Sequence, residues 1–102
     1  MGTLIYGTTG DGIVIADHLL AHLMAVTATK LRRNESFTIS WHGDRGQGRS
    51  TVWLHASIPL RFVYDEPEPV ALDRALLEDL SKAASGTAGI VVDLSSAGSS
   101  PA

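Results

Sequence analysis

The segment from Phe37 to His55 constrains the fold of this chain more than any other. Apolar and polar residues alternate in Phe37–His42 and again in Thr51–His55, and a glycine-rich stretch separates the two runs. Alternation at period two is typical of strands that bury one face, and two such runs around a turn predict an antiparallel hairpin. Whether Trp41 or Trp53 faces the core stays open, because a one-residue slip in the pairing exchanges the faces.

The pairing that we consider first turns five apolar side chains toward the core: Phe37, Ile39, Trp41, Val52 and Leu54. It places Ser40 near Trp53 and Thr38 near His55. The outward face then gathers a candidate binding set, which is Trp53, His42, His55, Ser40 and Arg61. Such sheet faces stack unpaired bases in some nucleic-acid-binding domains, at about 1–3 kcal/mol per base. The alternative is that a loop or a subunit covers Trp53.

The other segments predict an α+β fold. Short strands are expected near residues 3–6, 13–16, 60–64 and 90–94, and helices over residues 18–33 and 73–85. The element order is ββαβββαβ, and we expect one mostly antiparallel sheet with two helices packed on one face. Residues 1–94 then form a single domain, and the small, polar residues 95–102 form a flexible C-terminal tail.

The first helix carries a broad apolar face, with His18 and His22 expected toward solvent and Asp17 at the N-cap. A ridge of small residues, formed by Ala21, Ala25 and Ala28, permits close approach of another element or subunit. Asp73 is the expected N-cap of the second helix. The acidic, proline-rich stretch 65–69 is expected to form a stiff connector between the strand near residues 60–64 and that helix.

Charge is unevenly distributed along the chain, whose formal net charge is −3. Residues 30–61 have an excess of basic side chains, and residues 65–93 have an excess of acidic ones. This asymmetry indicates an anion-binding face, a head-to-tail self-contact or ordinary solvated surface. The candidate anion-binding residues are Arg32, Arg33, Arg45 and Arg49.

The sequence lacks the residues that several kinds of binding site and catalysis require. The stretch Gly43–Ser50 has the spacing of a phosphate-binding loop, but a strand and not a helix is expected after it. The chain has no cysteine, which excludes disulfides and thiolate chemistry. His18 and His22 share a helical spacing that suits a metal, but two ligands do not make a site. We therefore predict no metal, no cofactor and no catalytic set.

The residues Thr9–Gly10–Asp11–Gly12 are similar to the Lys-x-Asp-Gly motif of nucleotidyltransferases, with threonine at the lysine position. The motif then has no amine that could accept AMP. The chain resembles a family of short uncharacterised actinobacterial proteins, whose members are often labelled "ATP-dependent DNA ligase". The resemblance rests on Met1–Gly7, Leu20–Leu23, Lys30–Phe37, Ser40–Trp41, Gly48–Ser50, Trp53–His55 and Ser57–Leu60. It implies no catalytic residues, and at most an accessory nucleic-acid contact.

These observations lead to three hypotheses about function. We expect a non-enzymatic binding module that self-associates into a homo-oligomer. The second hypothesis is a nucleic-acid-binding accessory domain that uses the arginines and an exposed Trp53, and a small enzyme ranks third. No apolar run is long enough to cross a bilayer and no secretory signal is evident, so we expect a cytoplasmic protein without a membrane partner.

Overall fold

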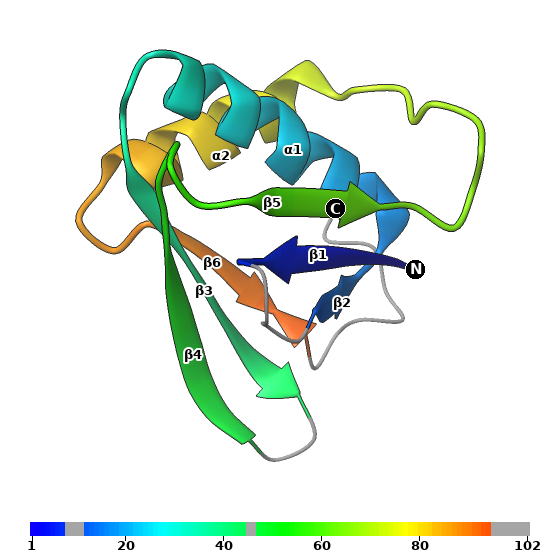
Figure 1. Cartoon of the computed structure of the whole chain (residues 1–102). Helices are drawn as coiled ribbons and strands as arrows, with labels where there is room; N and C mark the ends of the chain where they lie inside the picture. Colours follow the sequence, from blue (N-terminus) through cyan, green and yellow to red (C-terminus); the bar gives the residue numbers. More distant parts are fainter. Residues whose placement is uncertain (8–11, 45–46, 95–102) are drawn as a thin grey trace.

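A computed structural model describes residues 1–7, 12–44 and 47–94 of the chain. The expected tail 95–102 and the candidate residue Arg45 lie outside this described part. The elements follow the predicted order ββαβββαβ and confirm the α+β class (Figure 1). They are β1 (Gly2–Tyr6), β2 (Ile13–Ile15), α1 (Asp17–Arg32), β3 (Phe37–Asp44), β4 (Gln47–Leu54), β5 (Leu60–Val63), α2 (Arg74–Ser85) and β6 (Ile90–Asp93).

The strands form two three-stranded sheets rather than the one sheet that the sequence predicted. The β1 sheet has the order β2-β1-β5 and is antiparallel throughout, and the β3 sheet has the order β4-β3-β6. The chain leaves β4 at Ser57–Ile58–Pro59, where the Pro59 carbonyl accepts a hydrogen bond from the Gly7 N–H at 2.8 Å. This contact directs β5 to β1 instead of back to β4. The chain then passes through α2, and β6 enters beside β3 as the one parallel pair among the described strands.

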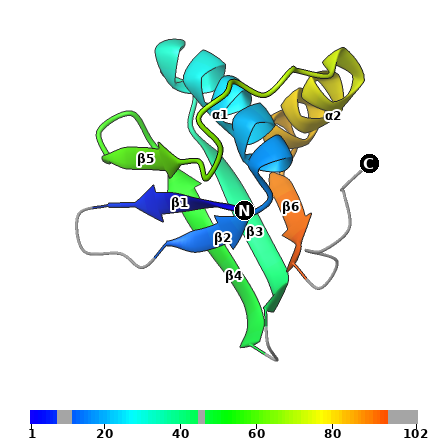
Figure 2. The same ribbon diagram turned by 90° about the vertical axis from the view of Figure 1, so that its right-hand side faces the viewer.

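Both helices lie together along one side of the molecule, and the strands of the two sheets run across one another (Figures 1 and 2). The core fills the space between these layers. It takes side chains from both sheets and from α1, and Ala84 from α2. Its members are Leu4, Ile13, Ile15, Leu19, Leu20, Leu23, Val26, Phe37, Ile39, Leu54, Ala84, Ile90 and Val92.

The β3–β4 hairpin settles which tryptophan faces the core. Ile39 and Leu54 are fully buried, and Trp41, two residues beyond Ile39, packs partly buried on the same side. Trp53 lies on the opposite face and is 58% exposed. Of the two alternatives that the sequence left open, the structure therefore has the one with Trp41 toward the core. The expected neighbours were wrong by two residues, because pairing continues through much of the glycine-rich stretch: Thr38 opposes Trp53 and Ser40 opposes Thr51.

The helix ends follow local chemistry in α2 and tertiary contacts in α1. The Asp73 side chain caps α2 by accepting a hydrogen bond from the Ala75 N–H at 2.9 Å, as predicted. The prediction that Asp17 caps α1 was wrong, because the N-cap is Ala16 and no side chain caps it. The Asp17 carboxylate instead binds backbone N–H groups of residues that follow β5.

Candidate functional site

Two regions have the exposed chemistry of a binding site. The first is the outer sheet face, which we define as the solvent side of the β3 sheet around Trp53. The second is the connector groove, which lies between α1 and the segment 64–73 that joins β5 to α2. The sequence predicted the first region and missed the second.

The outer sheet face brings together only part of the predicted binding set. Trp53 stands beside Thr38, whereas His42 lies opposite Arg49, near the other end of the hairpin. Four residues of extended strand separate Thr38 from His42, which is about 13 Å. The imidazole of His42 approaches the Asp93 carboxylate at 3.7 Å.

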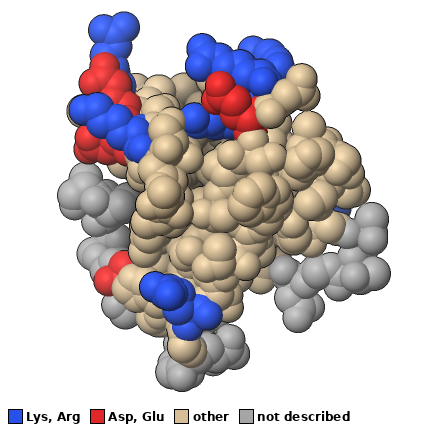
Figure 3. Space-filling model, turned by 90° about the vertical axis from the view of Figure 1, so that its left-hand side faces the viewer, with Lys and Arg blue, Asp and Glu red and all other residues tan. Residues whose placement is uncertain are grey.

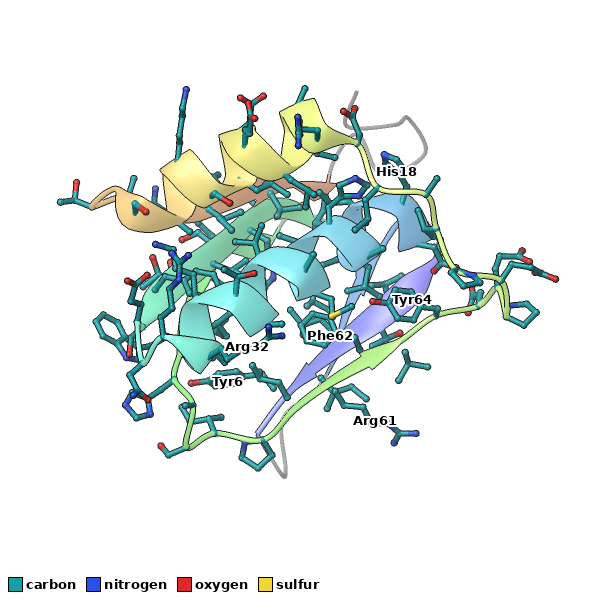
Figure 4. All side chains as sticks on the ribbon, turned by 90° about the horizontal axis from the view of Figure 1, so that it is seen from above. Tyr6, His18, Arg32, Arg61, Phe62 and Tyr64 are labelled. Atoms are coloured by element: carbon teal, nitrogen blue, oxygen red, sulfur yellow. The ribbon has the colours of Figure 1, made fainter. Side chains whose placement is uncertain are left out.

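The other three predicted residues have different surroundings. Ser40 is buried, and its hydroxyl shares a 2.7 Å hydrogen bond with the Thr51 hydroxyl. His55 is exposed beyond the end of β4, and its Nδ1 accepts from the Ser57 N–H at 3.1 Å. Arg61 belongs to the β1 sheet, where it pairs with Ile5, and it points away from α1 (Figure 4). The five residues therefore do not converge on one pocket.

The basic residues proposed for anion binding are also separated. Arg32 and Arg33 are exposed at the C-terminal end of α1. Arg49 is exposed five residues before Leu54 on β4, which places it about 17 Å along the strand from the end that lies beside α1. Figure 3 shows Lys and Arg in separate groups with a broad uncharged surface between them. The anion-binding set is thus not assembled in the described chain.

A shallow hollow does lie beside Trp53. It is lined by residues from the ends of α1 and α2 and from the start of β3, including Lys30, Thr38 and Thr87. Lys30 is already engaged, because its ammonium lies 3.2 Å from the Glu35 carboxylate and donates to the Ser85 hydroxyl at 2.7 Å. The hollow therefore combines an exposed indole with polar groups and little free positive charge.

The connector groove exists because two side chains of α1 hold the segment 64–73. The Asp17 carboxylate accepts hydrogen bonds from the Asp65 and Glu66 N–H groups, both at 3.1 Å. The N-terminal ammonium of Met1 lies 3.1 Å from the Asp65 carboxylate and 3.8 Å from Asp17. This ion pairing raises the pKa of the Met1 amine above its ordinary value, chiefly through a hydrogen bond to Asp65.

His22 holds the other end of the segment, and the prediction that it faces solvent was wrong. Its side chain is completely buried, and its Nε2 accepts a hydrogen bond from the Asp73 N–H at 2.8 Å. Its Nδ1 lies 2.7 Å from the His18 carbonyl oxygen, which can only accept. These two contacts require the neutral tautomer with the proton on Nδ1. Both ring nitrogens are thus occupied by the backbone.

Between the two anchors the segment arches away from α1 and leaves a cavity of about 270 Å³. Its lining is mostly apolar, with two glutamates at the rim. The lining residues are Ala21, Met24, Tyr64, Glu66, Pro67, Glu68, Pro69, Val70 and Leu72. Figure 4 shows Tyr64 and Phe62 between α1 and β5, with Arg32 toward the other end of the helix.

The Tyr64 hydroxyl is the unusual group in this groove. Its oxygen is buried and has no hydrogen-bond partner in the described part of the chain. Burial raises the pKa of the Tyr64 phenol above its usual value of 10.0, and the nearby Asp17 charge adds to the effect. A buried donor without a partner costs about 1–3 kcal/mol. The groove wall therefore carries an unsatisfied polar group in apolar surroundings.

Composition explains why the groove could not be found from the sequence. A short run rich in glutamate and proline is typical of a solvated spacer. What makes it a groove wall is its anchoring by Asp17 and His22, which lie roughly fifty residues earlier in the chain. Asp17 and His22 are not distinguished in the sequence from the other polar residues of α1, such as His18 and Thr29.

The described residues contain no cluster of three or more histidine, cysteine, aspartate or glutamate side chains placed to hold a metal ion. Among them, neither helix combines the length and apolarity that a membrane crossing requires.

Comparison with known proteins gives a family. A model of the family described as a domain of unknown function, DUF7882, matches residues 1–95. No curated protein and no solved structure matches the chain. The matched range takes in both the outer sheet face and the connector groove.

Proposed function

The chain belongs to the DUF7882 family, and we propose that it is a small non-enzymatic interaction module that binds a second copy of itself. One observation carries this proposal: exposed charges of opposite sign lie at the two ends of α1. The helix has 16 residues and is therefore about 24 Å long. Opposite charges held that far apart cannot satisfy one another within one molecule, but they can do so between two molecules.

The basic end is formed by Arg32 and Arg33, which are both exposed. Neither forms an ion pair with any described residue, whereas Lys30 beside them is paired with Glu35. The acidic end is formed by the segment beside the start of α1, where Glu66 and Glu68 are exposed. Their carboxylates likewise form no ion pair within the described ranges.

Exposed apolar side chains lie near the acidic end. Leu72 is 53% exposed and Met24 is 39% exposed, and both line the connector groove. Burial of such surface supplies affinity, while the charges supply orientation and specificity. The combination suits a reversible contact between copies.

Light scattering on the full chain tests the proposal. The average mass should rise over a micromolar concentration series at about 50 mM salt, and it should rise less at about 500 mM salt because added ions screen charges. A strict monomer at every concentration and both salt levels would overturn it.

A second candidate function is nucleic-acid binding, and the 58% exposure of Trp53 favours it. An exposed indole beside the polar hollow offers one stacking platform for an unpaired base. The ligase label that similar sequences carry fits at most such an accessory contact. Single-stranded DNA or RNA should then quench tryptophan fluorescence in a salt-dependent way. A W53A variant that binds equally well, or no binding at about 50 mM salt, would exclude this function.

A further inference from the structure

We propose that two copies pair through antiparallel α1 helices, with Arg32 of each copy docked at the connector groove of the other. This inference rests on the proposed self-association and specifies its surface and symmetry. It joins three features of the surface around α1. They are the partly exposed part of the alanine ridge at Ala25 and Ala28, the connector groove, and the exposed charges without an ion pair at both ends of α1.

The docking surface is a continuous stripe along α1. Ala21 and Met24 line the groove, and Ala25, Ala28 and Arg32 continue the same helical face at spacings of three and four residues. Ala25 and Ala28 are only half-buried within one copy. Small side chains at the centre of such a stripe let two helix axes approach to about 8 Å.

In an antiparallel arrangement, the stripe of one copy packs against the same stripe of the other copy. When Ala25 of one copy lies against Ala28 of the other, Arg32 falls beside Ala21 of the opposite copy, because both pairs have the same midpoint. Arg32 then stands at the mouth of the groove, about 16 Å along the helix from its own Ala21. The two-fold axis repeats the contact, so both basic ends meet acidic ends.

The groove suits an arginine side chain. Its apolar wall can cover the methylene stem, and Glu66 and Glu68 at the rim can accept from the planar guanidinium. The Asp65 carboxylate is less suitable, because the Met1 ammonium already lies 3.1 Å from it. An isologous pair of this kind closes as a dimer, whereas a head-to-tail contact would continue into a chain.

Charge reversal provides the test, measured by sedimentation of the full-length chain. R32E and the double variant E66R/E68R should each raise the dimer dissociation constant at least about tenfold, since like charges then face each other twice. An equimolar mixture of the two should restore a dimer, because every contact again joins opposite charges. R49E changes another exposed arginine, on β4, and should leave the dimer unchanged.

The outcomes separate this inference from the proposed function. If the unmodified chain dimerises but R32E behaves like R49E, the interface is elsewhere and self-association stands. If the mixture forms species larger than a dimer, the contact is head-to-tail and the two-fold arrangement is wrong. If the unmodified chain stays monomeric, both proposals fail. Circular dichroism of each variant confirms that a lost dimer reflects the interface and not unfolding.

Discussion

The outer sheet face and the connector groove are held in place by different parts of the chain. The sheet face rests on backbone pairing, in which β3 is bonded to β4 on one side and to β6 on the other. The groove rests on two side chains of α1, Asp17 and His22, which bind backbone N–H groups of a segment with no regular structure. The first region should therefore be most sensitive at its backbone, and the second at individual polar side chains.

The largest effect is expected at Gly89, where the backbone of β6 begins beside β3. Its φ of +70° lies in the left-handed region, and an added Cβ would lie 2.5 Å from the Thr38 carbonyl oxygen. We expect G89A to lower the free energy of unfolding by about 3–5 kcal/mol, because strain and overlap with the backbone add together. Urea denaturation followed by circular dichroism measures the loss.

G86A is the matched control for this prediction. Gly86 caps α2 at a negative φ, and an added Cβ there meets its nearest atom at 3.5 Å, an ordinary contact. Its effect should stay within about 1 kcal/mol. Equal losses for G86A and G89A would show that the joint between β3 and β6 is not the sensitive point of the sheet.

The next effect is expected at His22, which holds one end of the groove. In H22A the Asp73 N–H loses its acceptor and a cavity opens beside the core, so we expect a loss of about 3 kcal/mol. The segment 64–73 should also become more accessible to proteases, while the outer sheet face keeps its tryptophan fluorescence.

His18 offers the control on the same helix. Its ring lies tilted against that of His22, with centroids 4.5 Å apart, but its side chain makes no hydrogen bond with the described residues. H18A should cost less than about 1 kcal/mol. If H18A and H22A are equally destabilising, the hydrogen bond to Asp73 is not what secures the segment.

The contrast between local strand pairing and long-range side-chain contacts also explains which features the sequence could reveal. Alternation showed that Trp41 and Trp53 lie on opposite faces, because a strand has only two faces. It left open which face is buried, and the burial of Ile39 and Leu54 in the structure answers that question. The Asp73 cap was also predictable, since it depends on the next two residues alone. Local pattern is sufficient where the cause is local.

The features that the sequence did not reveal depend on contacts between residues far apart in the chain. His22 was expected toward solvent because no local pattern shows that residues near Asp73 return to cover it. The distance between two of the candidate arginines has a similar cause, since the length of the hairpin, and not the spacing in sequence, separates Arg49 from Arg32. The division into two sheets likewise depends on how β5 leaves β4, which alternation does not encode.

The smallest effect on stability is expected at Tyr64, in the wall of the connector groove. Its hydroxyl oxygen is buried without a partner, so Y64F should raise the free energy of unfolding by about 1 kcal/mol at neutral pH. Thr27 has the same defect in α1, away from the groove, and T27V is the control that should give a similar gain. A loss of stability in Y64F would mean that the hydroxyl has a partner.

Y64F and T27V should differ in how their stability changes at alkaline pH. Burial raises the pKa of the Tyr64 phenol in the folded chain above its unfolded value of 10.0. Its contribution to stability is therefore complete below pH 10 and is lost as the pH rises through the folded pKa, because the unfolded chain releases the proton first. In urea titrations between pH 9 and about 11, Y64F should lose less stability than T27V. Parallel pH profiles for the two variants would place the Tyr64 hydroxyl in water, and the groove would then be a more open surface than its lining indicates.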